Sequence, residues 1–125
     1  MEEYRSEKTE DTPEIHLNAE KGIFKIHGKS LPEDAAEFYY PVYEWFRNYV
    51  DDPAQETILD VHMEYINSSS VKRVFAILCL LEEIEPYHNT VLVKWKYEKG
   101  DDLMKEKGEE FDDYLEVPFE IVELN

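Results

Sequence analysis

The sequence predicts an α/β fold in which a mixed β-sheet packs against helices. Segments with apolar residues at every second position are interspersed with segments whose apolar residues recur at helical spacing, in the order β-β-α-β-α-β-α-β. Between residues 58 and 97 a strand, a helix and a second strand follow one another, which is typical of a parallel pair joined by a right-handed crossover. The chain of 125 residues, with 9 Tyr, 6 Phe and 2 Trp, is long enough for one core. We therefore expect a small α/β sandwich.

The two ends of the chain differ in composition. Residues 1–12 are charged and offer few apolar anchors, so we expect a flexible acidic N-terminal tail there and a single domain over residues 13–125. The tail lacks the apolar stretch of a signal peptide, and no apolar run approaches the roughly 20 residues that cross a bilayer. Cys79, the one cysteine, lies in an apolar helical pattern and is expected to be a small buried residue. These features favour the cytoplasm.

The formal charge of −17 restricts the partners of the chain. Nucleic acid and anionic membrane surfaces attract basic proteins, so we expect neither to bind here. The charge either provides solubility or attracts a basic surface on a partner protein.

The first half of the chain predicts a hairpin followed by a helix. Residues 15–19 and 23–27 alternate apolar and polar side chains on either side of a turn at 20–22, which predicts a β-hairpin. Residues 33–50 have helical spacing and end before Asp51-Asp52-Pro53. Pro41 interrupts this pattern, and it either kinks the helix or begins the main helix in its first turn. The apolar face comprises Phe38, Val42, Trp45, Phe46 and Tyr49.

The second half predicts three strands and two helices. A central strand over 58–66 places Leu59, Val61, Met63 and Tyr65 on one face. A helix follows from Ser69 to about residue 83, then a strand over 91–97 and a polar helix over about 101–113. Residues 117–122 form the last strand, and Pro118 near its start predicts a sheet edge. The stripe expected to be buried on the first of these helices comprises Val71, Val74, Phe75, Ile77, Leu78, Leu80 and Leu81.

The junction between the central strand and the next helix carries the most informative residues. Asn67 ends the strand, and Ser68, Ser69 and Ser70 open the helix, where backbone amides are unpaired and favour negative charge. In the simplest interpretation Ser68 or Ser69 caps the helix, which contributes about 1 kcal/mol. Three hydroxyl residues exceed what one cap requires, and functional loops of open α/β sheets lie at the carboxyl ends of strands.

Phosphorylation at this junction would act as a switch. It adds about 1.5 to 2 negative charges, which the helix amides and the nearby Lys72 and Arg73 would tolerate. A partner that docked on the same spot would not tolerate them, because a buried unpaired charge is costly. The pattern therefore indicates a gate on partner binding.

Other chemistry receives little support from the sequence. The chain has no G-x-S-x-G elbow, Walker A loop or dinucleotide fingerprint. His16, His27, His62 and His88 show no metal-ligand spacing with one another or with Cys79, so we expect neither a metal nor a cofactor. A small hydrolase with Ser68 as nucleophile remains an alternative, but His62 is a poor candidate base and no Gly-rich oxyanion turn follows.

Four segments together resemble the SiaC family of bacterial regulatory phosphoproteins, which is structurally akin to STAS-domain anti-sigma-factor antagonists. The resemblance runs from about Thr12 to Leu124. The segments that carry it are residues 24–34 (FKIHGKSLPED), residues 38–41 (FYYP) with Trp45 and Tyr49, residues 65–70 (YINSSS) with Lys72, and residues 95–119, which contain WKY, DDLM, GEEF and VPF.

The resemblance implies a non-enzymatic partner-switching protein with a STAS-like fold. In this family a dedicated serine/threonine kinase phosphorylates the hydroxyl residue after the Asn of the N-[S/T]-S-S motif, and a metal-dependent phosphatase removes the phosphate. The dephosphorylated form binds and activates a diguanylate cyclase, which raises cyclic di-GMP and promotes biofilm. The acceptor implied here is Ser68, with Ser69 and Ser70 as alternatives. Asn67, Ser69, Ser70, Lys72 and Arg73 are the expected partner-binding residues.

Two departures from related patterns define the alternatives. Ser68 stands where Thr is expected from the family, and Ser is chemically competent as the acceptor. The general STAS antagonist motif has Asp before the acceptor and often Gly soon after it, whereas this chain has Asn67 and Ser70-Val71. This places the chain nearer the SiaC branch, and leaves an antagonist of an anti-sigma kinase as the alternative within the binding class. A structural or oligomeric role through an exposed sheet edge is a further alternative.

Overall fold

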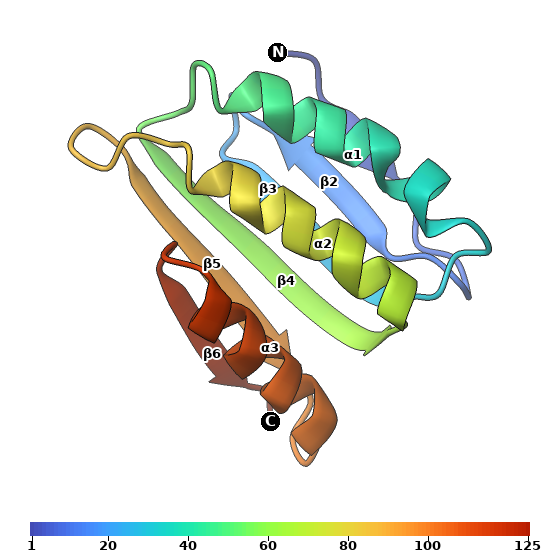
Figure 1. Cartoon of the computed structure of the whole chain (residues 1–125). Coiled ribbons are helices and arrows are strands. Elements are labelled where there is room, and N and C mark those ends of the chain that lie inside the picture. The colour runs from blue at the N-terminus through green and yellow to red at the C-terminus, as the bar shows by residue number, and fades with distance from the viewer.

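The computed structural model describes residues 1–125 as a six-stranded sheet with three helices on one of its faces (Figure 1). The strands lie in sequence order across the sheet, from β1 at one edge to β6 at the other. The elements are β1 Tyr4–Ser6, β2 Glu14–Asn18, β3 Ile23–Ser30, α1 Ala35–Tyr49, β4 Glu56–Ile66, α2 Ser68–Leu81, β5 Thr90–Tyr97, α3 Asp102–Tyr114 and β6 Phe119–Glu123.

The sheet is mixed, as the sequence predicts. Strands β1, β2 and β3 pair antiparallel, and β3 to β6 pair parallel, each joined to the next through one helix. Because each crossover steps to the neighbouring strand in the same direction, all three helices cover the same face. The predicted hairpin, the parallel pair around α2 and the edge position of the last strand after Pro118 are confirmed.

The N-terminal segment differs from its prediction. Residues 4–6, which the sequence assigned to a flexible tail, form edge strand β1, with Tyr4 paired to Leu17. The Trp45 indole N–H donates to the Glu2 carbonyl at 2.8 Å, which ties the segment to α1. The element order is therefore β-β-β-α-β-α-β-α-β, with one strand more than predicted.

The core lies between the sheet and its helices. Alternate residues of each central strand face the helices and are fully buried, among them Ile26, Val61 and Trp95. Helix α1 runs unbroken through Pro41, which is exposed, so the helix neither ends nor begins there. None of the helices combines the length and the apolar character that crossing a membrane requires.

A bulge in β4 changes the face of its last residues. Gly28 pairs with Met63, but the next residue, Lys29, pairs with Tyr65, so Glu64 is the extra residue. The prediction that Tyr65 shares the buried face of Met63 is therefore wrong, and Tyr65 is 50% exposed. Gly28 has a φ of 134°, and a Cβ there would lie 3.1 Å from the backbone of Pro13.

Helix α3 is anchored on Trp95. The indole N–H donates to the Met104 carbonyl at 3.0 Å, and the Trp95 ring meets Phe111 edge to face. Between these contacts Gly108 lies so close to the ring that a Cβ would overlap it. The absence of a side chain at position 108 thus sets the distance between α3 and the sheet.

We expect Gly108→Ala to lower the free energy of unfolding by about 1 to 2 kcal/mol, measured by urea denaturation. A Cβ at position 108 would overlap the Trp95 ring, so the overpacking cost should lie in the upper part of the usual range, about 2 to 3 kcal/mol, against a gain of about 1 kcal/mol in helix propensity. Glu109→Ala, at an exposed position of the same helix, is the control and should change stability little. A Gly108→Ala protein as stable as the original would contradict this account of α3.

Candidate functional site

Asn67 fixes the start of α2 through three hydrogen bonds. Its side-chain oxygen accepts hydrogen bonds from the Ser70 backbone N–H at 2.9 Å and from the Ser69 hydroxyl at 3.2 Å. Its backbone N–H donates to the Ser30 carbonyl at 2.9 Å. The N-cap is therefore Asn67, and the prediction of Ser68 or Ser69 as the cap is wrong. Because the Asn67 carboxamide caps α2, the Ser68 hydroxyl is not needed for capping and stays free.

The three serines have different surroundings. Ser68 is exposed and its hydroxyl makes no hydrogen bond within the chain, whereas the exposed Ser69 hydroxyl is engaged by Asn67. Ser70 is completely buried, so its hydroxyl is closed to an enzyme that works from solvent. Of the three candidate acceptors, Ser68 is thus the one whose oxygen is both accessible and unengaged.

A chain of buried hydroxyls holds Ser70 in place. The Ser30 hydroxyl donates to Ser70 Oγ at 2.9 Å and accepts from the Tyr39 hydroxyl at 2.6 Å. Burial raises the pKa of Tyr39 to about 12, so the phenol keeps its proton. These hydrogen bonds connect α2, β3 and α1 at Ser70, two residues after Ser68.

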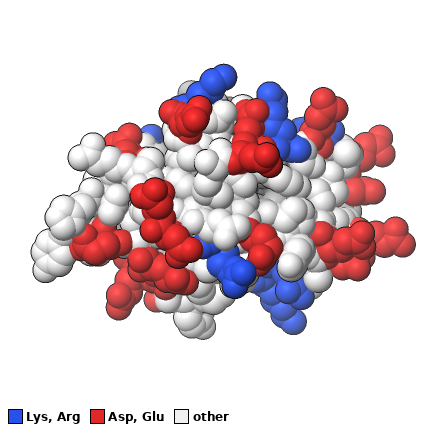
Figure 2. Space-filling model, turned by 90° about the horizontal axis from the view of Figure 1, so that it is seen from above, with Lys and Arg blue, Asp and Glu red and all other residues white.

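The electrostatic setting of Ser68 favours an added anion. The amides of Ser68 and Ser69 occupy the first helical positions, where no carbonyl within the helix can accept from them. Lys72 and Arg73 are exposed and form no ion pair. Elsewhere carboxylates dominate the surface, and in Figure 2 red acidic side chains cover much more of the face drawn than blue basic ones.

The predicted partner-binding residues lie on two sides of α2. Lys72 is one turn after Ser68 and shares its side of the helix. Ser69 and Arg73 instead line a hollow of about 850 Å³ toward the N-terminus of α1, together with Glu33, Asp34 and Glu37. The structure therefore separates two candidate surfaces that the linear sequence places together.

The four histidines lie away from Ser68. His16, His27 and His62 point from the face of the sheet that carries no helix, and His88 lies in the loop after α2. Each bonds a carboxylate, namely Glu3, Asp60, Glu98 and Glu85 respectively, and none bonds a serine. No group of three or more His, Cys, Asp or Glu side chains is arranged to hold a metal ion.

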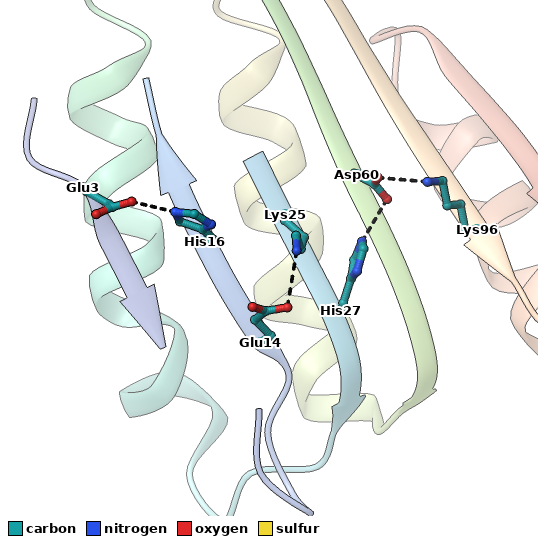
Figure 3. A network of polar contacts seen from close by, with 7 residues as sticks. All are labelled: Glu3, Glu14, His16, Lys25, His27, Asp60 and Lys96. Atoms are coloured by element: carbon teal, nitrogen blue, oxygen red, sulfur yellow. Dashed lines mark hydrogen bonds and ion pairs between the residues drawn. The ribbon is translucent and has the colours of Figure 1, made fainter. Parts of the chain in front are cut away.

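On this open face Asp60 contacts both His27 and Lys96, and the pairs Glu3–His16 and Glu14–Lys25 lie apart from it (Figure 3). Its carboxylate accepts from Lys96 at 2.9 Å and contacts His27 at 3.0 Å. Burial by itself would raise the pKa of Asp60, but the hydrogen bonds from Lys96 and His27 outweigh it and hold the pKa below its ordinary value. Burial lowers the pKa of His27 despite its bond to Asp60. Asp60 and Lys96 thus form an ion pair between β4 and β5, and His27 contacts the same carboxylate from β3.

Comparison with known proteins identifies the class. The model of the SiaC family of regulatory phosphoproteins matches residues 6–124, which is nearly the whole chain. An uncharacterized protein of Pseudomonas aeruginosa strain UCBPP-PA14 is 32% identical over 113 residues, which are 90% of this chain and 90% of that protein. The chain therefore belongs to the SiaC family.

Solved structures agree with this assignment. SiaC of Pseudomonas aeruginosa is 30% identical, with a TM-score of 0.88 over 99% of this chain and 100% of that one. A chain in the crystal structure of the diguanylate cyclase SiaD in complex with its activator SiaC, from the same organism, matches equally well, with a TM-score of 0.88, 30% identity, and coverage of 97% and 99%. The α/β fold and the family predicted from the sequence are confirmed.

We expect Asp60→Asn to lower the free energy of unfolding at pH 7 by about 1 kcal/mol, because a half-buried charged hydrogen bond to Lys96 is lost. The pKa of the Asp60 carboxyl is lower in the folded protein than in the unfolded one. The carboxylate therefore stabilises the fold at pH values above its unfolded pKa, and this stabilisation is lost as the pH falls through its folded pKa. The difference between the two proteins should therefore narrow below about pH 4. Urea denaturation of both proteins at several pH values measures this difference in the free energy of unfolding.

Glu98→Gln is the matched control for this measurement. Glu98 also bonds a histidine of the open face, His62, but the Glu98 side chain is 52% exposed. Glu98→Gln should therefore lower the free energy of unfolding less than Asp60→Asn does. A difference between Asp60→Asn and the original protein that stays constant down to pH 3 would contradict the proposed origin of the stabilisation.

Proposed function

We propose that this protein is a partner-switching regulator, reversibly phosphorylated on Ser68, whose unphosphorylated form binds and activates a diguanylate cyclase in a bacterial cytoplasm. A serine/threonine kinase adds the phosphate, and a metal-dependent phosphatase removes it. The protein itself catalyses no reaction in this scheme. The observation that carries the proposal is the exposed, unengaged hydroxyl of Ser68 at the N-terminus of α2.

Family membership supports the class of partner. SiaC is the activator of the diguanylate cyclase SiaD and forms a complex with it. The present chain shares the family model over residues 6–124 and carries Asn67-Ser68-Ser69-Ser70 at the start of α2. A cyclase of the same host is therefore the output partner that we propose.

Local charge explains how the phosphate would act. The free amides of α2 and the ammonium of Lys72, one turn away, stabilise a phosphoryl group on Ser68, so the modified protein stays folded. A partner that covers Ser68 would have to bury about two negative charges without a dedicated pair, which costs several kcal/mol. Phosphorylation thus opposes docking while leaving the fold intact.

The test is the affinity of the diguanylate cyclase from the same host for charge variants of this protein. Ser68→Ala should bind within about twofold of the unmodified protein, whereas Ser68→Asp should bind at least about tenfold more weakly, corresponding to about 1.4 kcal/mol. Isothermal titration calorimetry gives both values, and cyclase activity should follow them.

Ser69→Asp is the matched control, because it adds the same charge one residue further on, toward α1. It should weaken binding less than Ser68→Asp. Equal affinities of Ser68→Ala and Ser68→Asp for the cyclase would refute control of binding by phosphorylation of Ser68. A stronger effect of Ser69→Asp than of Ser68→Asp would indicate that Ser69 is the phosphorylated residue.

A further inference from the structure

Strand β6 leaves one edge of the sheet open (Figure 1). It pairs with β5 on one side over its 5 residues, and no strand lies on its other side. The opposite edge strand, β1, has 3 residues, and its central residue is the cation Arg5. Strand β6 is therefore the longer of the two edges at which another chain could add a strand.

The hydrogen bonds to β5 show which backbone groups of β6 are free. The Val93 N–H donates to the Pro118 carbonyl at 2.9 Å, and the Leu124 N–H donates to the Tyr97 carbonyl at 2.8 Å. Bonded residues alternate along a strand, so positions 118, 120, 122 and 124 face β5. The backbone N–H and C=O groups at positions 119, 121 and 123 therefore point away from the sheet, where an added strand would bond them.

The side chains of β6 differ between the two faces of the sheet. Phe119 and Ile121 lie on the face that carries the helices, where they pack partly buried against the core. Glu120 is exposed on the open face. Its register partner on β5 is Lys94, but the two side chains do not form an ion pair. An added strand would thus meet apolar side chains on one face and an unpaired carboxylate on the other.

Further carboxylates lie around this edge. Glu123 is exposed near the end of β6, and Glu109 and Asp112 are exposed on α3. Helical spacing places these two on the side of α3 opposite to positions 110 and 114, which line a hollow beside α2, and hence on the side of β6. None of the three carboxylates forms an ion pair. Lys105 shares this side of α3 and offsets only part of their charge.

These free carboxylates favour a basic occupant over a second copy of the chain. A second copy would bring the same acidic residues against the edge, and the charge of −17 on each copy opposes the contact. A strand in which Lys or Arg alternates with an apolar residue fits better. In an antiparallel arrangement its apolar side chains lie directly opposite Phe119 and Ile121, and its cations lie beside Glu120.

We propose that β6 is a docking edge for an extended basic segment of a partner protein, which pairs antiparallel with β6 and adds a strand to the sheet. Its backbone bonds the free groups at positions 119, 121 and 123. This surface goes beyond the proposed function, because α2 and Ser68 follow β4, which is two strands away from β6.

The test titrates the protein with a short synthetic peptide of alternating lysine and valine. Hydrogen exchange followed by NMR should show that bound peptide protects the amides of Phe119, Ile121 and Glu123, because the added strand accepts their hydrogen bonds. A peptide with proline in place of its central valine has the same charge but loses a backbone donor, so it should bind at least about tenfold more weakly. Equal binding of the two peptides, or unprotected amides, would overturn strand addition.

Charge reversal gives a second comparison. Glu120→Lys should weaken binding of the lysine–valine peptide at least about fivefold, whereas Glu20→Lys, in the turn between β2 and β3, should leave it within about twofold. Both substitutions change the net charge equally, and both side chains are exposed and free of ion pairs, so both variants should fold, which thermal unfolding verifies. Equal effects of the two would show general attraction to an acidic protein and overturn β6 as the site.

Two further results separate this edge from other surfaces. Ser68→Asp should bind the peptide within about twofold of the unmodified protein, because the two sites are apart. Loss of peptide binding in Ser68→Asp would place the peptide at the phosphorylation site instead. A dimer of the protein alone, with the amides of Phe119, Ile121 and Glu123 already protected, would show that a second copy occupies the edge and would overturn the basic partner.

Discussion

The start of helix α2 depends on one set of buried polar contacts, and the candidate site depends on that start. Asn67 caps the helix, while Ser70 points into the core and meets the hydroxyls of Ser30 and Tyr39. A buried hydroxyl left without its partner costs about 1 to 3 kcal/mol, so these contacts fix the rotation of α2 about its axis. That rotation turns Ser70 inward and leaves Ser68 facing solvent. The same contacts connect β3, α1 and α2, so a phosphate added to Ser68, as we propose, would lie on a part of the fold that buried hydrogen bonds hold in place.

The one-sided arrangement of the helices creates the surfaces around the site. Three successive crossovers place α1, α2 and α3 on one face of the sheet, with all three N-termini at the carboxyl ends of the parallel strands (Figure 1). Helices α1 and α2 pack together, but α3 is held by Trp95 and Gly108 at its own position on the sheet. The incomplete contact between α2 and α3 leaves Val71 and Phe75, which the sequence predicts to be buried, only partly buried. The opposite face of the sheet carries no helix, and paired charges such as Asp60 with Lys96 lie on it.

Most of the sheet could be predicted from alternation and helical spacing, because those patterns reflect burial directly. The missed features depend on contacts that a linear pattern does not contain. Strand β1 is short and polar, and it exists through pairing with β2 and the bond from Trp45. Tyr65 points outward because of a bulge that pairing with β3 defines. The position between a strand and a helix predicts that the serine cluster matters, but it does not predict which residue caps the helix or which hydroxyl is exposed. Asn67 competes with serine for the cap, and only the rotation of α2 distinguishes Ser68 from Ser70.

Ser68 as a regulatory phosphorylation site is tested most directly by intact-mass measurement and phosphosite mapping of the protein purified from its own host across growth conditions. We expect a fraction of molecules with one added phosphoryl group, located on Ser68 and absent from the buried Ser70. A protein that stays unmodified in every condition, including in the presence of the host's cognate kinase, would contradict the account and make Ser68 an ordinary first residue of a helix.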